Sequence, residues 1–233
     1  IVINIMNKIK FLLSIFFIFF SISCSKETNK KTIIIEKNIE AQILKSYNEG
    51  LEELESGDAL FAAKKFNEVE TMFPQSKWAP KSTLMAAYAY YSQDYYYDAI
   101  EELNLFLRKY PNHEDIDYAY YLLGISYYEQ IVDEKKDLKS IMMSKKKFDY
   151  VVNNFPDTEY ALDAKFKLDL ISDIQASKEM YIGRYYFNKK KWIPAINRFR
   201  NVLDKYETTI YIEEALHRLV EVHYTLGLID EAQ

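Results

Sequence analysis

The feature that most constrains this chain is an internal repeat of small and aromatic residues. One unit runs Gly50, Ala62, Phe66, Val69, Phe73 and Pro74, and each position recurs 37 residues later as Ala87, Ala99, Leu103, Phe106, Tyr110 and Pro111. A third unit, with eight extra residues between its first two columns, carries Gly124, Ser144, Phe148, Val151, Phe155 and Pro156. A fourth carries Gly183, Ala195, Phe199, Val202 and Tyr206, and a fifth starts with Val220 and Ala232. A period of this length indicates one supersecondary unit stacked on copies of itself.

The repeated unit is predicted to be a helical hairpin. From Ala41 onward apolar residues recur at i, i+3, i+4 and i+7, which is typical of amphipathic helices. A small residue on each helix lets the two backbones approach, while the aromatic and aliphatic columns fill the seam. Proline after the last aromatic residue ends the second helix. These patterns predict an all-α solenoid of the tetratricopeptide (TPR) type with about five repeats, three in residues 41–156 and two in residues 157–233.

The spacing between units predicts one unusually long helix. The closing column of a unit precedes the next small-residue column by 13 residues, except that 27 residues separate Pro156 from Gly183. The fourteen extra residues are close to four helical turns, so they preserve the direction in which side chains point. We therefore expect one continuous helix from Ala161 to Phe187 between repeats three and four.

The amino-terminal region is predicted to be a lipoprotein signal peptide and tether. A short basic stretch after Met6 precedes the apolar run from Phe11 to Ile22, which is typical of a secretory signal over residues 1–23 and is too short for a membrane span, the alternative interpretation. Cys24, the only cysteine, follows Ser23 and resembles a lipobox, although a buried structural cysteine is the simpler alternative. Residues 24–40 are polar and mixed, with lysines and asparagine around residues 33–35, which are isoleucines, and they indicate a lipidated tether. Ser25 stands where aspartate would resemble an inner-membrane retention signal, which favours the outer membrane.

Composition and motifs argue against catalysis and nucleic-acid binding. The net charge of −5 provides no broad basic surface for phosphate groups. His113, His217 and His223 are not spaced as a helical metal pair, and neither a G-x-S-x-G nor a phosphate-binding loop is present. We expect no enzyme, metal site or cofactor. Two lysine triplets, 145–147 and 189–191, are interpreted as solvated faces.

Several stretches resemble the BamD family, also called ComL or YfiO, over essentially the whole mature chain. The most specific is Tyr110-Pro-Asn-His-Glu-Asp-Ile-Asp-Tyr-Ala-Tyr-Tyr-Leu-Leu-Gly124, and residues 155–160 and 192–198 resemble two further family signatures. The loop from Ile131 to Ser144 and the unfinished fifth repeat depart from the family pattern. The resemblance implies a periplasm-facing lipoprotein of the outer membrane and a subunit of the BAM complex, with other BAM lipoproteins beside it.

The resemblance also implies two binding sites. The back half would dock on a POTRA domain of the barrel subunit BamA, through Arg198 with Asn197 beside it, although a solvated arginine is the plainer interpretation. The front half would receive unfolded outer-membrane proteins. Six tyrosines that lie beside the packing columns are expected to form that groove, unless they only pad neighbouring repeats: Tyr47, Tyr88, Tyr91, Tyr118, Tyr121 and Tyr128.

The alternative function is that of another TPR lipoprotein scaffold, associated with pilus assembly or the cell wall. A pilus-assembly protein should show near-uniform repeats, whereas the spacings between second-helix columns here are 37, 45 and 51 residues. A cell-wall scaffold should show an amino-terminal coiled coil, and that pattern is missing from the sequence.

Overall fold

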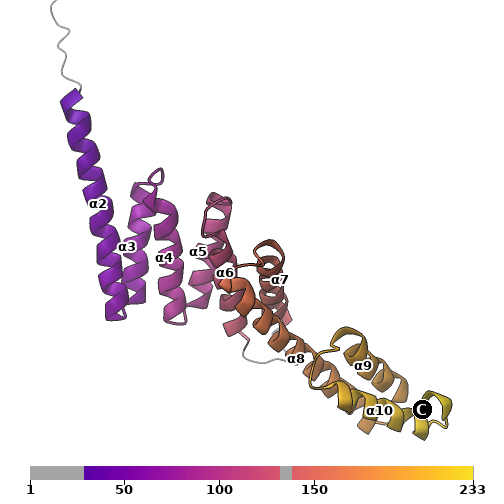
Figure 1. Ribbon diagram of the computed structural model, residues 1–233. Helices are drawn as coiled ribbons and strands as arrows, with labels where there is room; N and C mark the ends of the chain where they lie inside the picture. The colour runs from indigo at the N-terminus through magenta and orange to yellow at the C-terminus, as the bar shows by residue number, and fades with distance from the viewer. Residues whose placement is uncertain (1–28, 132–137, 233) are drawn as a thin grey trace, which may run out of the picture. The chain divides into compact units, whose positions relative to one another are not determined.

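The computed structural model describes residues 29–131 and 138–232, and within these residues the fold is helical throughout. The helices are α2 (Asn29–Ser56), α3 (Ala59–Met72), α4 (Trp78–Ser92), α5 (Tyr96–Lys109), α6 (Ile116–Glu129), α7 (Leu138–Asn154), α8 (Glu159–Asn188), α9 (Trp192–Lys205) and α10 (Ile212–Thr225), followed by a 3-10 turn at Asp230–Ala232 (Figure 1). Cys24 and the predicted signal peptide lie outside the described residues. In the described part of the chain, no helix combines the length and apolar character needed to cross a membrane.

The chain divides into two compact units, residues 1–45 and residues 46–233. The described part of the first unit is the amino-terminal portion of α2. This helix begins at Asn29, twelve residues before the apolar periodicity that starts at Ala41, so the predicted tether is helical from Asn29 onward. The second unit contains the hairpins.

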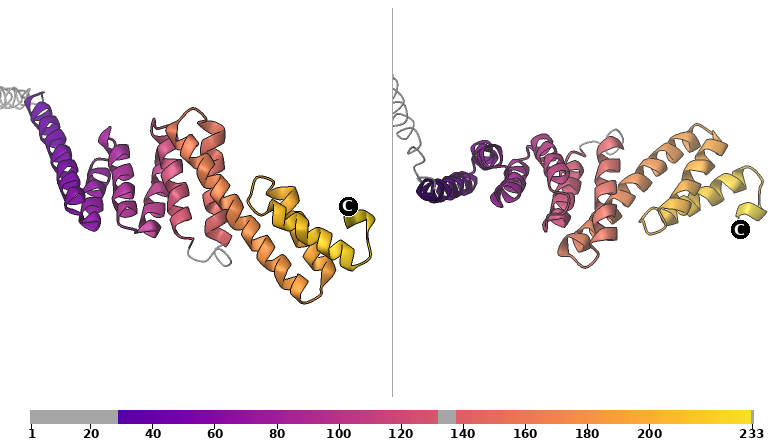
Figure 2. Two further views of the ribbon diagram at one scale, coloured as in Figure 1. Left: turned by 60° about the horizontal axis from the view of Figure 1, so that its bottom comes forward. Right: turned by 90° about the horizontal axis from the view of Figure 1, so that it is seen from above.

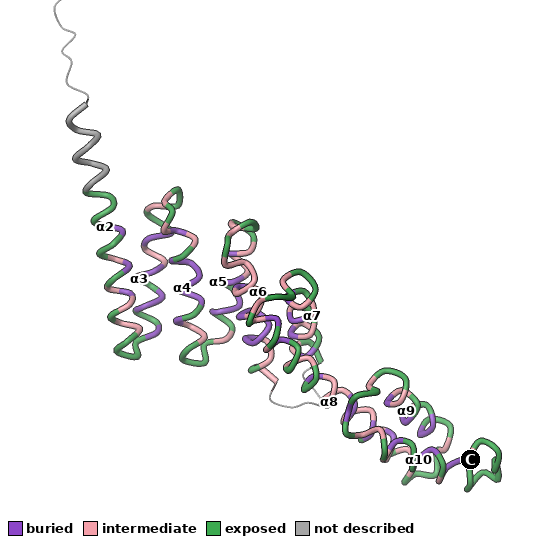
Figure 3. The backbone as a smooth tube through the Cα atoms, in the orientation of Figure 1, coloured by how far each residue is buried: buried purple, intermediate pink, exposed green. Residues whose placement is uncertain are grey.

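The hairpins of the second unit form because each helix from α3 onward packs against the next one in sequence (Figures 1 and 2). The predicted columns are the contacts: the fully buried side chains include Phe66, Phe106, Phe148 and Phe199. Buried positions lie where neighbouring helices face one another (Figure 3). The TPR-type helical solenoid is therefore confirmed.

The aromatic column that closes each unit caps the second helix. The backbone N–H of Phe73 donates to Val69 O at 2.9 Å, and the equivalent bonds of Tyr110, Phe155 and Tyr206 are 2.8, 2.9 and 3.0 Å long. Side-chain caps at the starts of helices do not recur from repeat to repeat. The side chains of Asp58 and Thr158 accept hydrogen bonds from the N–H groups of Phe61 and Ala161, which satisfies one free donor at the start of α3 and of α8.

The predicted long helix is also confirmed. Helix α8 is 30 residues long and contains the whole predicted range without interruption. Its first half contributes buried side chains as far as Ile171 to a core shared with α4–α7, and its second half contributes Ala176 and later residues to a core shared with α9 and α10.

The eight extra residues of the third unit lengthen a helix rather than forming only a loop. Helix α7 begins at Leu138, which is six residues before the Ser144 column. Ile141, in this added turn, is buried in the first core. Our treatment of the range from Ile131 to Ser144 as a loop is therefore wrong from Leu138 onward.

Candidate protein-binding site

Helices α6 and α8 bring three tyrosine rings into one cluster. The ring of Tyr160 lies 5.2 Å from that of Tyr118 and 5.3 Å from that of Tyr121, measured between centroids. The Tyr121 hydroxyl donates a hydrogen bond of 2.7 Å to Asp163 Oδ2 on α8. Aromatic rings at these distances attract one another beyond their buried area, and the hydrogen bond fixes the orientation of one phenol.

Two tyrosines of α4 lie beside this cluster. Tyr91 is half-buried against the first core, and Tyr88 is 39% exposed. Burial raises the pKa of the Tyr118 hydroxyl, and the nearby phenols of Tyr88, Tyr160 and Tyr91 raise it further. Four of the six predicted groove residues therefore gather at one place. We call Tyr88, Tyr91, Tyr118, Tyr121, Tyr160 and Asp163 the tyrosine cluster.

Tyr128 lies further along the same helices, in a separate hollow. The Lys167 ammonium is 4.9 Å from the centre of the Tyr128 ring, within the range of a cation–π interaction. Tyr128 lines a pocket of about 260 Å³ together with Leu170, Asp173, Ile174, Ser177 and Tyr211. A second pocket, of about 170 Å³, includes Glu129 and Ile131. The end of α6, the middle of α8 and the start of α10 thus surround a hollow lined by both polar and apolar side chains.

Tyr47 does not belong to an open groove, and our prediction for this residue is wrong. Its ring is only 6% exposed and packs against Phe66 at 5.3 Å and Trp78 at 5.1 Å. Trp78 belongs to the following repeat, so Tyr47 fills the junction between two hairpins.

Sequence reasoning missed Tyr160 and Asp163, which complete the cluster. They stand three residues apart at the start of α8, on the same face as each other, and Ala161 and Ala164 beside them are fully buried. A tyrosine and an acid, each directly before a small core residue, were the available signal. The pairing with α6 depends on tertiary packing, which one helix pattern does not reveal.

Arg198 forms an ion pair within the chain. Its Nη1 lies 3.1 and 3.2 Å from the two carboxylate oxygens of Glu179 on α8, and Asn201 donates to the same carboxylate at 3.3 Å. The Arg198 side chain remains 39% exposed, and Asn197 beside it is exposed. Glu179 therefore holds a partly accessible guanidinium in a fixed orientation.

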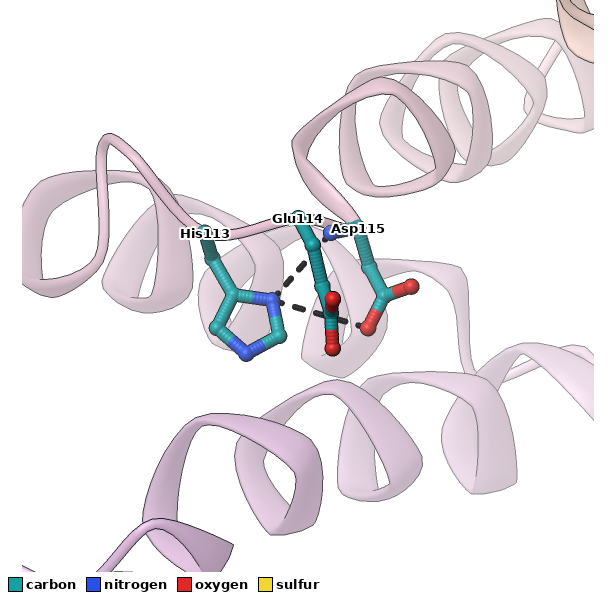
Figure 4. A group of neighbouring side chains, drawn as sticks. All are labelled: His113, Glu114 and Asp115. Carbon is teal, nitrogen blue, oxygen red and sulfur yellow. Dashed lines mark hydrogen bonds and ion pairs between the residues drawn. The ribbon is translucent and has the colours of Figure 1, made fainter.

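His113, Glu114 and Asp115 are the one close group of potential metal ligands among the described residues (Figure 4). His113 Nδ1 accepts a hydrogen bond of 3.2 Å from the Asp115 backbone N–H, and the ring packs edge-on to Phe106 at 5.5 Å. Both contacts stabilise the turn that leads into α6. The geometry therefore gives this histidine a structural role.

Comparison with known proteins extends over most of the chain. The family model YfiO, described as outer membrane lipoprotein, matches residues 40–233. The chain is 42% identical to the outer membrane protein assembly factor BamD of Rickettsia prowazekii over 84% of this chain and 78% of that protein. It is 38% identical to the BamD of Caulobacter vibrioides over 90% of this chain and 68% of that protein. A solved structure of the TPR2AB domain of yeast Sti1 is similar with a TM-score of 0.47 and 14% identity, over 82% of this chain and 74% of that one. The chain belongs to the YfiO family of outer membrane lipoproteins.

Proposed function

We propose that this protein is a lipid-anchored, periplasm-facing scaffold subunit of the BAM complex, which assembles β-barrel proteins into the outer membrane. Its relatives are named outer membrane protein assembly factors, and this supports the proposal most directly. A scaffold needs binding surfaces rather than a reactive constellation, and the two surfaces proposed here are the tyrosine cluster and the exposed edge of the Arg198–Glu179 pair.

The tyrosine cluster is the proposed site for unfolded barrel segments. Tyrosine offers a large contact area at low entropic cost together with a hydroxyl group, which suits a site that must accept many sequences. Tyr88 is 39% exposed and lies at the edge, while Tyr118 and Tyr121 are held by packing and by Asp163. Because packing and the hydrogen bond fix the orientation of these rings, an extended segment would bind to a surface that is already ordered.

A fluorescent peptide with the sequence of a barrel carboxy-terminal strand tests this site. We expect the parent protein to bind it and the Tyr91→Ala, Tyr121→Ala double variant to bind about tenfold or more weakly, since truncating a hot-spot tyrosine costs about 2 kcal/mol or more. Tyr97 and Tyr224 are 78% and 69% exposed at other places, so Tyr97→Ala with Tyr224→Ala is the matched control. Because Tyr121 is packed in the fold, the single change Tyr88→Ala provides a variant that spares the core. Unchanged binding by both cluster variants would reject the site.

The edge around Arg198 and Asn197 is the proposed docking site for a POTRA domain of BamA. A guanidinium can contact a partner carboxylate through its remaining donors, and Arg198 keeps some of them exposed. Arg198→Ala and Arg198→Glu should both reduce the amount of barrel subunit that co-purifies from solubilised membranes.

Glu179 allows a sharper version of this docking test. Glu179→Gln removes the internal carboxylate but leaves Arg198, so it should preserve recovery of the barrel subunit if Arg198 itself contacts the partner. Equal loss with Arg198→Ala and Glu179→Gln would instead indicate that the ion pair only maintains the α8–α9 packing.

The proposed anchor is Cys24, which would be acylated after cleavage of residues 1–23. Palmitate labelling of the parent and of Cys24→Ala tests it, and equal label in both proteins would exclude the anchor. The several acyl chains of a lipoprotein cysteine bind a membrane far more firmly than one chain does.

A further inference from the structure

The tip of the α8–α9 hairpin consists entirely of lysine. Helix α8 ends at Asn188 and α9 begins at Trp192, so Lys189, Lys190 and Lys191 form the whole connection. Their backbone N–H groups donate to the last turn of α8, with bonds of 3.1 and 3.2 Å from Lys189, 2.8 Å from Lys190 and 3.0 Å from Lys191. All three side chains are exposed. The backbone is thus ordered while the ammonium groups extend into solvent.

Two residues of this tip are not the ones that would best stabilise the local backbone. Lys190 has φ 57°, a left-handed conformation that glycine adopts more easily, and Gly57 and Gly227 occupy the equivalent turn positions of other hairpins. Lys191 precedes α9 without a side-chain cap, where Asp58 caps the start of α3. A cation near a helix amino terminus also opposes the helix dipole. Residues that break local rules together are expected where function requires them.

The surrounding sequence concentrates positive charge in a chain whose net charge is −5. From Met180 to Leu203 there are six basic residues and no acidic one. Arg184 pairs with Glu214 at 2.8 Å and Arg198 pairs with Glu179 at 3.1 Å. The three tip lysines and Arg200 form no ion pair with any described residue.

Apolar and aromatic side chains accompany these cations. Ile193, two residues after Lys191, is 71% exposed, and Tyr185 on the last turn of α8 is 55% exposed. Trp192 lies between the lysines and Ile193 and packs edge-on to Phe187 at 5.5 Å. The exposed face of α9 then continues through Asn197 to Arg200. The end of this hairpin thus combines three exposed lysines with an exposed isoleucine and an exposed tyrosine, so it presents both cationic and apolar side chains to solvent.

We propose that the tip, defined as Lys189–Lys191 with Tyr185 and Ile193, rests on a membrane surface by binding the anionic headgroups of phospholipids. Lysines near an anionic surface attract it electrostatically, and aromatic residues are enriched at the boundary between headgroups and acyl chains. An acidic protein surface is the weaker candidate, because protein interfaces favour arginine and are depleted of lysine. Membership of an outer membrane lipoprotein family brings the chain to such a surface.

Trp192 is a natural reporter for this contact. The other tryptophan, Trp78, can be replaced by phenylalanine to leave a single fluorophore. That change keeps a ring beside Tyr47, and it removes no hydrogen bond, because Trp78 Nε1 has no partner in the described part of the chain. The full-length lipoprotein carrying Trp78→Phe is reconstituted into vesicles that contain either brominated phosphatidylglycerol or brominated phosphatidylcholine. Bromine quenches a tryptophan that reaches the lipid.

We expect Trp192 to be quenched in phosphatidylglycerol vesicles, less so at high salt, and hardly at all in phosphatidylcholine vesicles. Changing Lys189, Lys190 and Lys191 to glutamine should abolish the quenching, and Ile193→Ser should reduce it. The matched control changes three exposed lysines elsewhere, Lys139, Lys146 and Lys165, to glutamine and should be quenched like the parent.

Two outcomes would overturn the proposal. The first is a parent protein that bromine does not quench in anionic vesicles, and the second is equal quenching of the tip variant and its control. If quenching is absent but the tip variant loses co-purified membrane proteins, the surface belongs to a protein interface and the lipid contact is rejected. Peptide binding at the tyrosine cluster should persist in the tip variant, so this test can fail independently of the proposed function.

Discussion

Gly183 lies directly against the ring of Phe199, so closely that a Cβ atom at this glycine would be 2.5 Å from Phe199 Cε1. The same relationship holds between Gly50 and Phe66 and between Gly124 and Phe148, where the distance would be 2.8 Å in each case. The remaining complete repeat carries alanine and leucine in these two columns, as Ala87 and Leu103, and both are fully buried. The larger side chain, phenylalanine, is therefore paired with glycine, and the smaller one, leucine, is paired with alanine.

This pairing predicts how the two columns respond to substitution. Gly183→Ala should lower the free energy of unfolding by about 1–3 kcal/mol, because the added methyl group overpacks the seam. Adding Phe199→Leu, which recreates the Ala87–Leu103 pair, should recover part of that loss, with a coupling energy of about 1 kcal/mol or more. Urea denaturation of the parent, both single variants and the double variant measures this cycle. Strictly additive effects would show that the columns are independent.

Lys190→Gly should raise the melting temperature. The left-handed conformation costs a non-glycine residue roughly 1–2 kcal/mol, and part of this is offset because glycine loses more freedom on folding. Asp94, with φ 63°, is the matched comparison. Its carboxylate accepts a hydrogen bond of 2.6 Å from the Tyr96 hydroxyl, so Asp94→Gly should stabilise less or destabilise. A larger gain at Asp94 than at Lys190 in thermal unfolding would contradict this account.

Glu102 predicts a pH-dependent change in stability. Burial raises the pKa of its carboxyl group, although the hydrogen bond from Asn67 opposes the shift, and Oε2 has no partner among the described residues. A carboxyl with a raised pKa binds its proton more tightly in the folded state. The penalty for burying the charge is therefore relieved as pH falls through the folded pKa, and it is fully present above that pKa.

The test variant for this group is Glu102→Gln, which can still accept from Asn67. It should melt at a higher temperature than the parent at pH 7.5, and the difference should shrink as pH is lowered towards the ordinary glutamate range. Glu101→Gln removes an exposed neighbouring charge and should show no such trend. A constant difference between Glu102→Gln and the parent across this range would show that the charge of Glu102 is not responsible.

The hydrogen bond between Tyr121 and Asp163 should contribute measurably to the packing of α6 on α8. Tyr121→Phe keeps the ring and removes the donor, and it should cost about 0.5–1.5 kcal/mol. Asp163→Ala should then cost less in the Tyr121→Phe background than in the parent. Tyr97→Phe, at a 78% exposed position, serves as the control and should be neutral in the same denaturation assay.

The repeat columns predict the hairpins and α8 well because they record contacts within one unit, which recur at fixed spacing. Contacts between units follow no such spacing. Tyr47 is buried by Trp78 of the next repeat, and Tyr160 joins the tyrosine cluster from a helix whose pairing with α6 no local pattern encodes. Helix α2 begins at Asn29, in a segment that lacks the apolar periodicity of the later helices. The composition of this segment therefore predicted a tether and did not reveal the helix.

Helix α8 also connects the two cores through a short segment that neither core fully buries. The four residues from Ser172 to Gln175 separate the last buried residue of the first core from the first buried residue of the second, and each of the four is only half-buried. No fully buried side chain of either core lies in this segment, although Ile174 packs against the first core. The tyrosine cluster and Arg198 lie on opposite sides of it, so a partner that holds one arm could swing the other about a short helical pivot while both arms stay folded.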